Sequence, residues 1–145
     1  MGTASPTFTV RPALRSDAAA LLRLAQAFAA SFTVDPERFD RSLDATLVHH
    51  DSLLLVATDE GEVVGYLVAS VHPTLYANGP VAWVEELMVD EVERRSGIGR
   101  ALVEECERWA VRNGARLVTV ATRRASDFWT AIGYEPSATY LRKLL

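Results

Sequence analysis

The chain has 145 residues, of which 49% are hydrophobic and 23% are charged, and its formal net charge is −4 at pH 7. Length and composition predict one globular domain over residues 1–145 and exclude a disordered chain. The negative charge argues against nucleic acid as a partner, and no apolar run of about 18 residues exists that would predict a membrane span. Residues 1–6 lack a signal-peptide pattern and Cys106 is the one cysteine, so we expect a cytoplasmic protein.

The first third of the chain predicts a strand followed by two helices. Phe8 to Pro12 is a short strand candidate, and Ser16 is placed to cap a helix whose apolar stripe begins at Leu21. Asp35 and Pro36 predict the start of a second helix, because aspartate caps helix N-termini and proline is favoured in the first helical position.

The middle of the chain predicts three strands. Leu53 to Thr58 and Val63 to Val71 are apolar, β-branched runs on either side of a polar, glycine-containing turn, which predicts a hairpin. The segment His72 to Pro80 contains two prolines and a glycine and predicts a loop. The run Val81 to Val89 then predicts a further strand.

The last part of the chain alternates helices and strands. A helix is expected from Gly99 to Asn113, a strand from Leu117 to Ala121, a short helix from Ala125 to Ile132, and a last strand from Thr139 or Tyr140 onward. This order predicts the α/β class, with a mixed sheet and helices on both of its faces. The strands at 81–89 and 117–121 should be parallel neighbours, because a helix connects them.

The turn between the strand at 81–89 and the next helix is the most informative feature of the sequence. It consists of Arg94, Arg95, Ser96, Gly97, Ile98 and Gly99, with Arg100 directly after it. The first N–H groups of a helix have no partner within the helix, glycines let a ligand approach them, and arginines add positive charge. The turn therefore predicts a site for a phosphorylated ligand. A dinucleotide-binding fingerprint is disfavoured, because Leu102 occupies its third glycine position.

Two adjacent acids, Glu85 and Glu86, lie in the otherwise apolar strand from Trp83 to Val89. Strand interiors disfavour glutamate and buried acids are rare, so these two residues call for a reason. One explanation is a catalytic role. The other is that both side chains are simply exposed to solvent where the end of the strand separates from its neighbour. Their side chains should point to opposite faces of the sheet unless a bulge intervenes.

These motifs resemble those of the GNAT family of N-acetyltransferases. The basic turn matches the family's acetyl-CoA-binding signature, which is Arg or Gln, two residues, Gly, one residue, and Gly or Ala, placed after an apolar strand. The family's late helix is matched in spacing by Ala125, Phe128, Gly133 and Tyr134, and its opening by Val10-Arg11-Pro12 followed by Asp17. The resemblance covers essentially the whole chain and implies the GNAT fold, a mixed, mostly antiparallel sheet with helices on both faces.

The resemblance further implies acetyl-CoA as co-substrate and an amine as acceptor, with no metal. The backbone and side chains from Arg95 to Arg100, with Arg94 beside them, would hold the pyrophosphate of coenzyme A, and Trp129 would lie against the cofactor. The pantetheine arm would pair with Leu87, Met88 and Val89. In the family this strand carries a β-bulge that frees an N–H for the thioester carbonyl, and such a donor stabilises the oxyanion of the tetrahedral intermediate.

The chemistry then requires a base and raises a question about the acid. A carboxylate would relieve the amine of its proton for direct attack in a ternary complex, and we favour Glu85, with Glu86 as second choice or as the residue that orients the amine. Many family members carry a tyrosine that protonates the departing thiolate, and its position here is Trp129, whose indole cannot give up a proton. Either the thiolate leaves unaided, or Tyr134 or Tyr140 substitutes.

Alternatives to an active enzyme of this type remain at this stage. One is a catalytically weak or inactive acyl-CoA-binding sensor or regulatory module of the same fold, which the loss of the tyrosine keeps open. Another is a toxin that acetylates charged transfer RNA, against which the net charge of −4 argues. The acceptor site is expected within residues 28–41 and 72–80. Its apolar wall would be Phe32, Phe39, Leu75 and Tyr76, and the acids Asp35, Glu37 and Asp40 would attract a cation. Family members make a homodimer the expected assembly.

Overall fold

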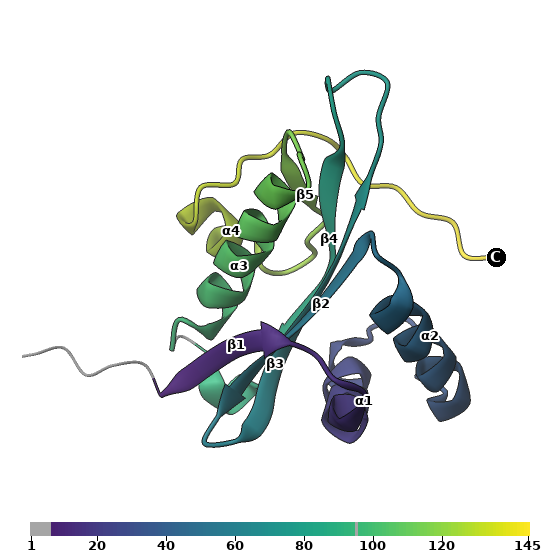
Figure 1. The fold of residues 1–145 in the computed structure, drawn as a ribbon, viewed down its shortest axis with the longest axis vertical. Helices are drawn as coiled ribbons and strands as arrows, with labels where there is room; N and C mark the ends of the chain where they lie inside the picture. The colour runs from purple at the N-terminus through teal and green to yellow at the C-terminus, as the bar shows by residue number, and fades with distance from the viewer. Residues whose placement is uncertain (1–6, 95) are drawn as a thin grey trace, which may run out of the picture.

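The computed structural model describes residues 7–94 and 96–145. Within them, five strands form one sheet in the order β1-β2-β3-β4-β5 (Figure 1). The strands are β1 (Phe8–Pro12), β2 (Ser52–Asp59), β3 (Glu62–His72), β4 (Val81–Val89) and β5 (Val118–Val120). The first four pair antiparallel, and β4 and β5 pair parallel, so the expected mixed, mostly antiparallel sheet is confirmed.

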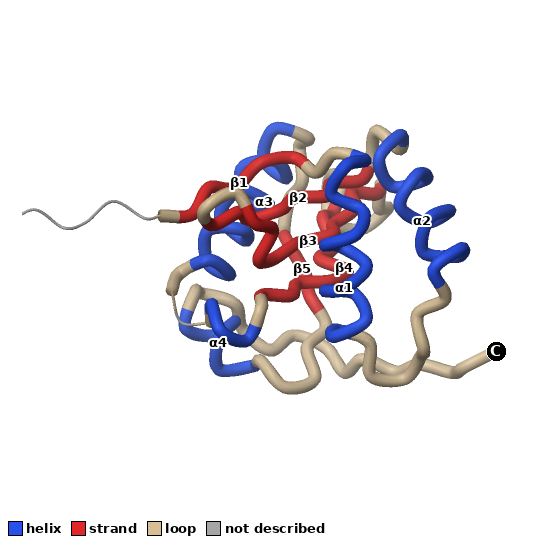
Figure 2. Tube along the Cα trace, turned by 90° about the horizontal axis from the view of Figure 1, so that it is seen from below, coloured by secondary structure: helices blue, strands red, loops and turns tan. Residues whose placement is uncertain are grey.

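Helices cover both faces of this sheet, as expected. On one face lie α1 (Ala18–Phe28) and α2 (Pro36–Val48), and on the other lie α3 (Ile98–Arg112) and α4 (Ser126–Ala131). Figure 2 shows the strands between these two pairs of helices. Two short 3-10 turns, η1 (Arg15–Asp17) and η2 (Glu91–Glu93), precede α1 and follow β4. No helix in the described part of the chain is long and apolar enough to cross a membrane.

Each face of the sheet has its own hydrophobic core, because neighbouring strand residues point to opposite sides. Leu55 and Leu67 pack with Leu102 of α3 on one face, whereas Val56 packs with Leu24 of α1 on the other. All five side chains are at most 2% exposed. Burying one such side chain stabilises a fold by about 1.5–3 kcal/mol, so both helix layers are held firmly against the sheet.

The starts of the first two helices differ in how they are capped. Asp35 accepts a hydrogen bond from the N–H of Arg38 at 2.9 Å, with Pro36 in the first turn, so this predicted cap is confirmed. The prediction for Ser16 was wrong, because Ser16 lies inside η1 and α1 begins only at Ala18. The residue that organises this corner is Asp17, whose carboxylate accepts from the N–H of Leu14 and from both terminal nitrogens of Arg11.

The predicted last strand is also wrong. In the described residues after α4 no strand forms, and residues 135–145 are all exposed. The neighbouring strand β5 is only three residues long, which offers few backbone groups for pairing. Pro136, near the start of the segment, has no N–H to donate to a ladder. The segment instead crosses to the α1 and α2 side (Figure 1), where Arg142 donates to Ser31 Oγ at 2.9 Å.

Candidate active site

A β-bulge interrupts β4 at Glu85. Val68 of β3 lies opposite Glu86, but the next residue, Ala69, lies opposite Val84. Glu85 is therefore the extra residue on β4, with no residue of β3 opposite it in this register. A bulge of this kind shifts the alternation of a strand by one residue. The bulge that the resemblance implied is present, and it falls on the first of the two glutamates.

The same residue marks the point where β4 and β5 part. β5 pairs only with Ala82, Trp83 and Val84, whereas β4 continues to Val89. The N–H of Asp90 donates to Val64 of β3 at 2.7 Å. Backbone N–H and C=O groups alternate in direction along a strand. Those of Met88 and Glu86 therefore also point to β3, and those of Leu87 and Val89 point to the opposite side. The edge of β4 from Leu87 to Val89 thus presents backbone groups beyond the end of β5.

The N-terminus of α3 lies next to this edge. A Cβ placed on Gly99 would lie 3.3 Å from the ring of Phe128 and 3.8 Å from a methyl carbon of Val89. The end of β4, the first turn of α3 and the ring from α4 therefore meet around Gly99. Gly97 precedes the helix with φ of +90°, the left-handed conformation that glycine adopts without strain. No side chain of the described residues caps the helix, so its first N–H groups can receive an anion.

Arg94 and Arg100, the described arginines of this turn, are exposed. Arg94 donates from Nε to the carbonyl oxygen of Val89 at 3.2 Å, which ties the turn to the end of β4. Arg100 is paired with Glu104, one turn along α3, at 3.0 Å. The hydroxyl of Ser96 donates to the carbonyl oxygen of Glu93. Arg95, which the sequence also placed here, lies outside the described residues.

Because of the bulge, the two glutamates reach side chains on the same face of β3. Glu85 accepts a hydrogen bond from Ser70 Oγ at 3.3 Å, and Glu86 accepts one from the hydroxyl of Tyr66 at 2.7 Å. Ser70 and Tyr66 are four residues apart on one strand, and side chains at even spacing share a face. That face is the one covered by α1 and α2. Of the two alternatives given by the sequence, opposite faces or a bulge, the structure shows the bulge.

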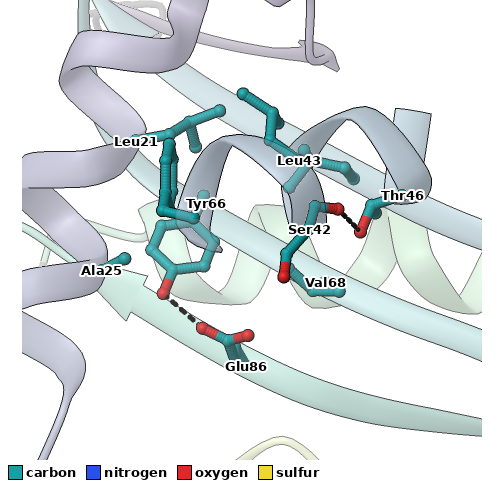
Figure 3. Close-up of a pocket in the computed structure, with 10 residues that line it drawn as sticks. Leu21, Ala25, Ser42, Leu43, Thr46, Tyr66, Val68 and Glu86 are labelled. Carbon is teal, nitrogen blue, oxygen red and sulfur yellow. Dashed lines mark hydrogen bonds between the residues drawn. The ribbon is translucent and has the colours of Figure 1, made fainter. Parts of the chain in front are cut away.

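Glu86 and Tyr66 form the polar end of a pocket between α1, α2 and the sheet (Figure 3). Tyr66 is 3% exposed, and burial together with the charge of Glu86 raises the pKa of its phenol far above the ordinary value. The phenol therefore stays protonated and donates to the carboxylate. Glu86 is half-buried at the pocket wall, whereas Glu85 is exposed. The preference for Glu85 as the base stays a prediction, and the pocket lining includes Glu86 and not Glu85.

The pocket differs in composition from the acceptor wall that the sequence suggested. Phe39 does line it, but Phe32, Leu75 and Tyr76 are at least 70% exposed and do not. Asp40 pairs with Arg15 instead of facing the pocket lining. Sequence reasoning missed most of the lining, which is Leu21, Ala25, Ser42, Leu43, Thr46, Leu54, Tyr66 and Val68 in addition to Phe39 and Glu86. A tyrosine in the middle of an apolar strand was the one available signal.

Trp129 and Tyr134 lie on the opposite face. Trp129 is 5% exposed within the core on the α3 side and makes edge contacts with Phe128 and Tyr134. The hydroxyl of Tyr134 donates to Glu107 at 3.0 Å, and burial and the Glu107 charge raise the pKa of this phenol. Glu107 is nine residues beyond the start of α3, roughly 14 Å along its axis. This placement gives no support to Tyr134 as the acid, and Tyr140 is 60% exposed in the C-terminal segment.

The described residues contain no group of three or more His, Cys, Asp or Glu side chains that could hold a metal ion. The candidate site combines the part of β4 beyond the end of β5, a helix N-terminus that no described side chain caps, and a carboxylate on a bulged strand. Together these can hold an extended phosphorylated ligand on one side of β4 and a cationic group on the α1 and α2 side.

Comparison with known proteins gives a consistent result. A profile of the Acetyltransferase (GNAT) family matches residues 19–134. The sequence is 27% identical over 144 residues to the uncharacterized N-acetyltransferase YhfO of Bacillus subtilis, covering 94% of this chain and 95% of that protein.

The fold is shared with solved structures. One is a transcriptional regulator from Bacillus halodurans C-125, with a TM-score of 0.86, 21% identity and coverage of 95% and 99% of the two chains. Another is glucosamine-6-phosphate N-acetyltransferase from Arabidopsis thaliana, with a TM-score of 0.85, 20% identity and coverage of 95% and 98%. At such identities these structures support the fold and not the substrate.

Proposed function

This chain belongs to the GNAT family of acetyltransferases, which use acetyl-CoA, and from that premise we propose that it transfers the acetyl group directly to a primary amine bound beside Glu86. The observation that carries the proposal is the position of the bulge. Glu85 is the bulged residue, β5 pairing ends at Val84, and Glu86 follows at the pocket wall. In this proposal the cofactor binds along one side of this short piece of strand, and the acceptor binds in the pocket on the other side.

The cofactor would be held mainly by backbone groups. The pyrophosphate of coenzyme A would accept hydrogen bonds from the N–H groups of Ile98, Gly99 and Arg100, where the helix dipole favours negative charge. Exposed Arg94 and Arg100 would add charge-assisted contacts. The amides of the pantetheine arm would pair with the carbonyl oxygen of Leu87 and the N–H of Val89, as a further strand pairs with a sheet edge, because the carbonyl oxygen of Val89 already accepts from Arg94.

The bulge would also serve the reaction itself. The N–H of Leu87 is directed away from β3, and we assign it to the thioester carbonyl oxygen. As the amine attacks, this oxygen gains negative charge. A fixed donor at that position is worth about 3–4 kcal/mol of barrier in enzymes where one has been removed.

Glu86 is the proposed base. An amine with a pKa of ~10.4 is almost fully protonated at pH 7, which costs the attack roughly 4–5 kcal/mol. The carboxylate of Glu86 lines the pocket, and Tyr66 fixes its orientation through the 2.7 Å hydrogen bond. It can take the proton directly or through water. Glu85, hydrogen-bonded to Ser70, is the second candidate.

No acid is assigned to the departing sulfur. A thiol with a pKa of ~8.5 is a good leaving group as the thiolate. Trp129 is packed in the core, where it supports the ring of Phe128 beside Gly99. We therefore propose that the thiolate leaves unaided and takes its proton from water.

A second candidate function is an acyl-CoA-binding module with little turnover. The observation in its favour is that Tyr134 is bound to Glu107 and Trp129 replaces the tyrosine of many family members. The two functions predict the same cofactor binding and differ only in whether any amine yields product. A cytoplasmic location and a homodimer also belong to the proposal, and sedimentation of the purified protein tests the second.

The direct test is thermal unfolding with and without acetyl-CoA, followed by an assay of thiol release with a panel of amines. Acetyl-CoA at 100 times its dissociation constant should add about 2.7 kcal/mol of stability and raise Tm by about 5–10 °C. Release of thiol with at least one amine supports the enzyme. A shift without release from any amine supports the binding module, and no shift contradicts both.

A further inference from the structure

The pocket beside Glu86 has three walls. α1 contributes Leu21 and Ala25, and the sheet contributes Leu54, Tyr66, Val68 and Glu86. α2 contributes Phe39, Ser42, Leu43 and Thr46. Figure 3 shows Leu21, Leu43 and Val68 around the cavity and the Tyr66–Glu86 hydrogen bond at one end of it. The acceptor must therefore place its amine at this end and its remaining atoms against α1 and α2.

The lining carries a single charge. Among the described residues that form it, Glu86 is the one carboxylate, no lysine, arginine or histidine is present, and most of the others are apolar. The nearby cations are engaged outside the pocket, since Arg15 pairs with Asp40 and Asp44, and Arg23 pairs with Asp90. One ammonium group is thus balanced by Glu86. A second charge on the acceptor would lie against hydrocarbon without a counter-ion, which is strongly unfavourable.

The remaining polar groups of the lining offer few further contacts. The hydroxyl of Tyr66 already donates to Glu86, and the hydroxyl of Thr46 donates to the carbonyl oxygen of Ser42 within α2. Among the described residues of the lining, the hydroxyl of Ser42 is the one further side-chain hydroxyl that can bond to the acceptor. An acceptor rich in hydroxyl groups would therefore lose its hydrogen bonds to water without replacing them. The lining favours a hydrocarbon group.

The pocket is partly open to solvent, so its volume bounds the part of the acceptor that the lining can surround and not the whole acceptor. The pocket holds about 110 Å³. For comparison, one water occupies about 30 Å³ of liquid, and an apolar cavity of about 150 Å³ accommodates benzene. About four carbon atoms therefore fit, which corresponds to a short branched chain.

Resting on the N-acetyltransferase function proposed above, we propose that the acceptor is a primary monoamine with a short branched aliphatic group. The amine nitrogen forms a bond to the thioester carbonyl carbon, the carbon–sulfur bond breaks, and coenzyme A leaves as the thiolate. The ammonium group loses two protons in total. One passes through Glu86 to water, and the other ends on the thiolate sulfur through water. The products are the N-acetylated amine and free coenzyme A.

The first test is a specificity series on the unmodified protein, with thiol release from acetyl-CoA as the readout. We expect kcat/KM for 3-methylbutylamine to exceed that for ethylamine by at least 10-fold, because each methylene in an apolar pocket contributes about 10-fold or more. It should exceed that for 1,4-diaminobutane by at least 100-fold, since the second ammonium enters the apolar part. Equal or higher activity with the diamine or with an aminoglycoside would overturn the proposal.

The second test fills the pocket. Ala25→Leu adds three carbons at the α1 wall, whereas Ala27→Leu makes the same change on an exposed position of α1 outside the lining. We expect Ala25→Leu to lower kcat/KM for 3-methylbutylamine at least 10-fold while ethylamine changes less than threefold, and Ala27→Leu to leave both values unchanged. Equal losses for both amines would contradict the proposal.

These outcomes separate this proposal from the function on which it rests. An acetyl-CoA-induced rise in Tm together with release by diamines alone overturns the monoamine proposal and leaves the acetyltransferase standing. If acetyl-CoA causes no rise in Tm and no amine releases thiol, both the acetyltransferase function and the monoamine proposal are overturned.

Discussion

The two proposed sites, one on each side of the sheet, are built in different ways. On the α3 side, the groups assigned to the cofactor are backbone N–H groups at the edge of β4 and at the start of α3, positioned by Gly97 and by the bulge at Glu85. On the α1 and α2 side, the groups assigned to the acceptor are side chains, with Glu86 and Tyr66 at their centre. A backbone site tolerates changes in most side chains, whereas a side-chain site changes its ligand with each substitution. The fold can thus keep one co-substrate while the acceptor varies.

The largest effect should come from removing the proposed base. Glu86→Gln keeps the size of the side chain and a hydrogen-bond partner for Tyr66 but cannot take a proton. We expect kcat/KM for the amine to fall about 100-fold or more, within the range for a lost general base, while the acetyl-CoA-induced rise in Tm stays the same. Steady-state thiol release and thermal unfolding measure the two quantities. Glu85→Gln is the matched control, and a larger loss in that variant would move the base to Glu85.

The next largest effect should fall on the cofactor side alone. Gly97→Val forces a β-branched residue to adopt φ of +90° at the start of α3. We expect the affinity for acetyl-CoA to fall about 10-fold, as measured by titration calorimetry. Gly114→Val is the control, because Gly114 lies after the end of α3 with φ of +76° and has open space around it. That variant should lose similar stability and keep its affinity, and equal losses of affinity would refute a specific role for the turn.

A smaller effect should distinguish the phenols of Tyr66 and Tyr134, each of which donates to a glutamate. Tyr66→Phe removes the donor to Glu86, and we expect kcat to fall about 3–10-fold with little change in KM for acetyl-CoA. Tyr134→Phe removes the donor to Glu107 on the other face, and kcat should stay within about twofold. Both are read from steady-state kinetics. A large loss of kcat in Tyr134→Phe would restore Tyr134 as the acid.

The smallest effect on activity is expected at the corner before α1. The hydrogen bond from Arg11 lowers the pKa of Asp17, so its carboxylate contributes stability above the unfolded-state pKa of ~3.9, and this is lost as the pH falls through the lower folded-state value. Asp17→Asn should cost about 1–3 kcal/mol at pH 7, with kcat/KM unchanged at 25 °C. Urea unfolding should show the difference from the unmodified protein shrinking below pH 4. A constant difference across this range would contradict the ion pair as its source.

Sequence and structure agree best where local pattern decides the conformation. The strand from Val81 to Val89 has the predicted bounds, and Asp35 and Pro36 begin α2 as their residue types require. The turn before α3 was predicted from its glycines and arginines, and the structure places Gly97 directly before the helix in a left-handed conformation. Each of these features is specified by a few neighbouring residues.

Agreement is poorest where distant segments meet. The pocket combines residues from α1, α2 and three strands, and no spacing along the sequence brings Ala25 and Ser42 together. The face of the sheet on which the side chains of Glu85 and Glu86 lie depends on the position of the β-bulge, and the sequence is compatible with a bulge at either glutamate. The absence of the last strand depends on the short β5, whose length is set by its pairing with β4.

The measurement that tests the central claim most directly is thiol release from saturating acetyl-CoA with 3-methylbutylamine, compared between the unmodified protein and Glu86→Gln. We expect release by the unmodified protein, a loss of at least 100-fold in the variant, and the same acetyl-CoA-induced rise in Tm for both. Equal rates in the two proteins, or no release with any amine, would contradict the assignment of Glu86 as the residue that prepares the amine for attack.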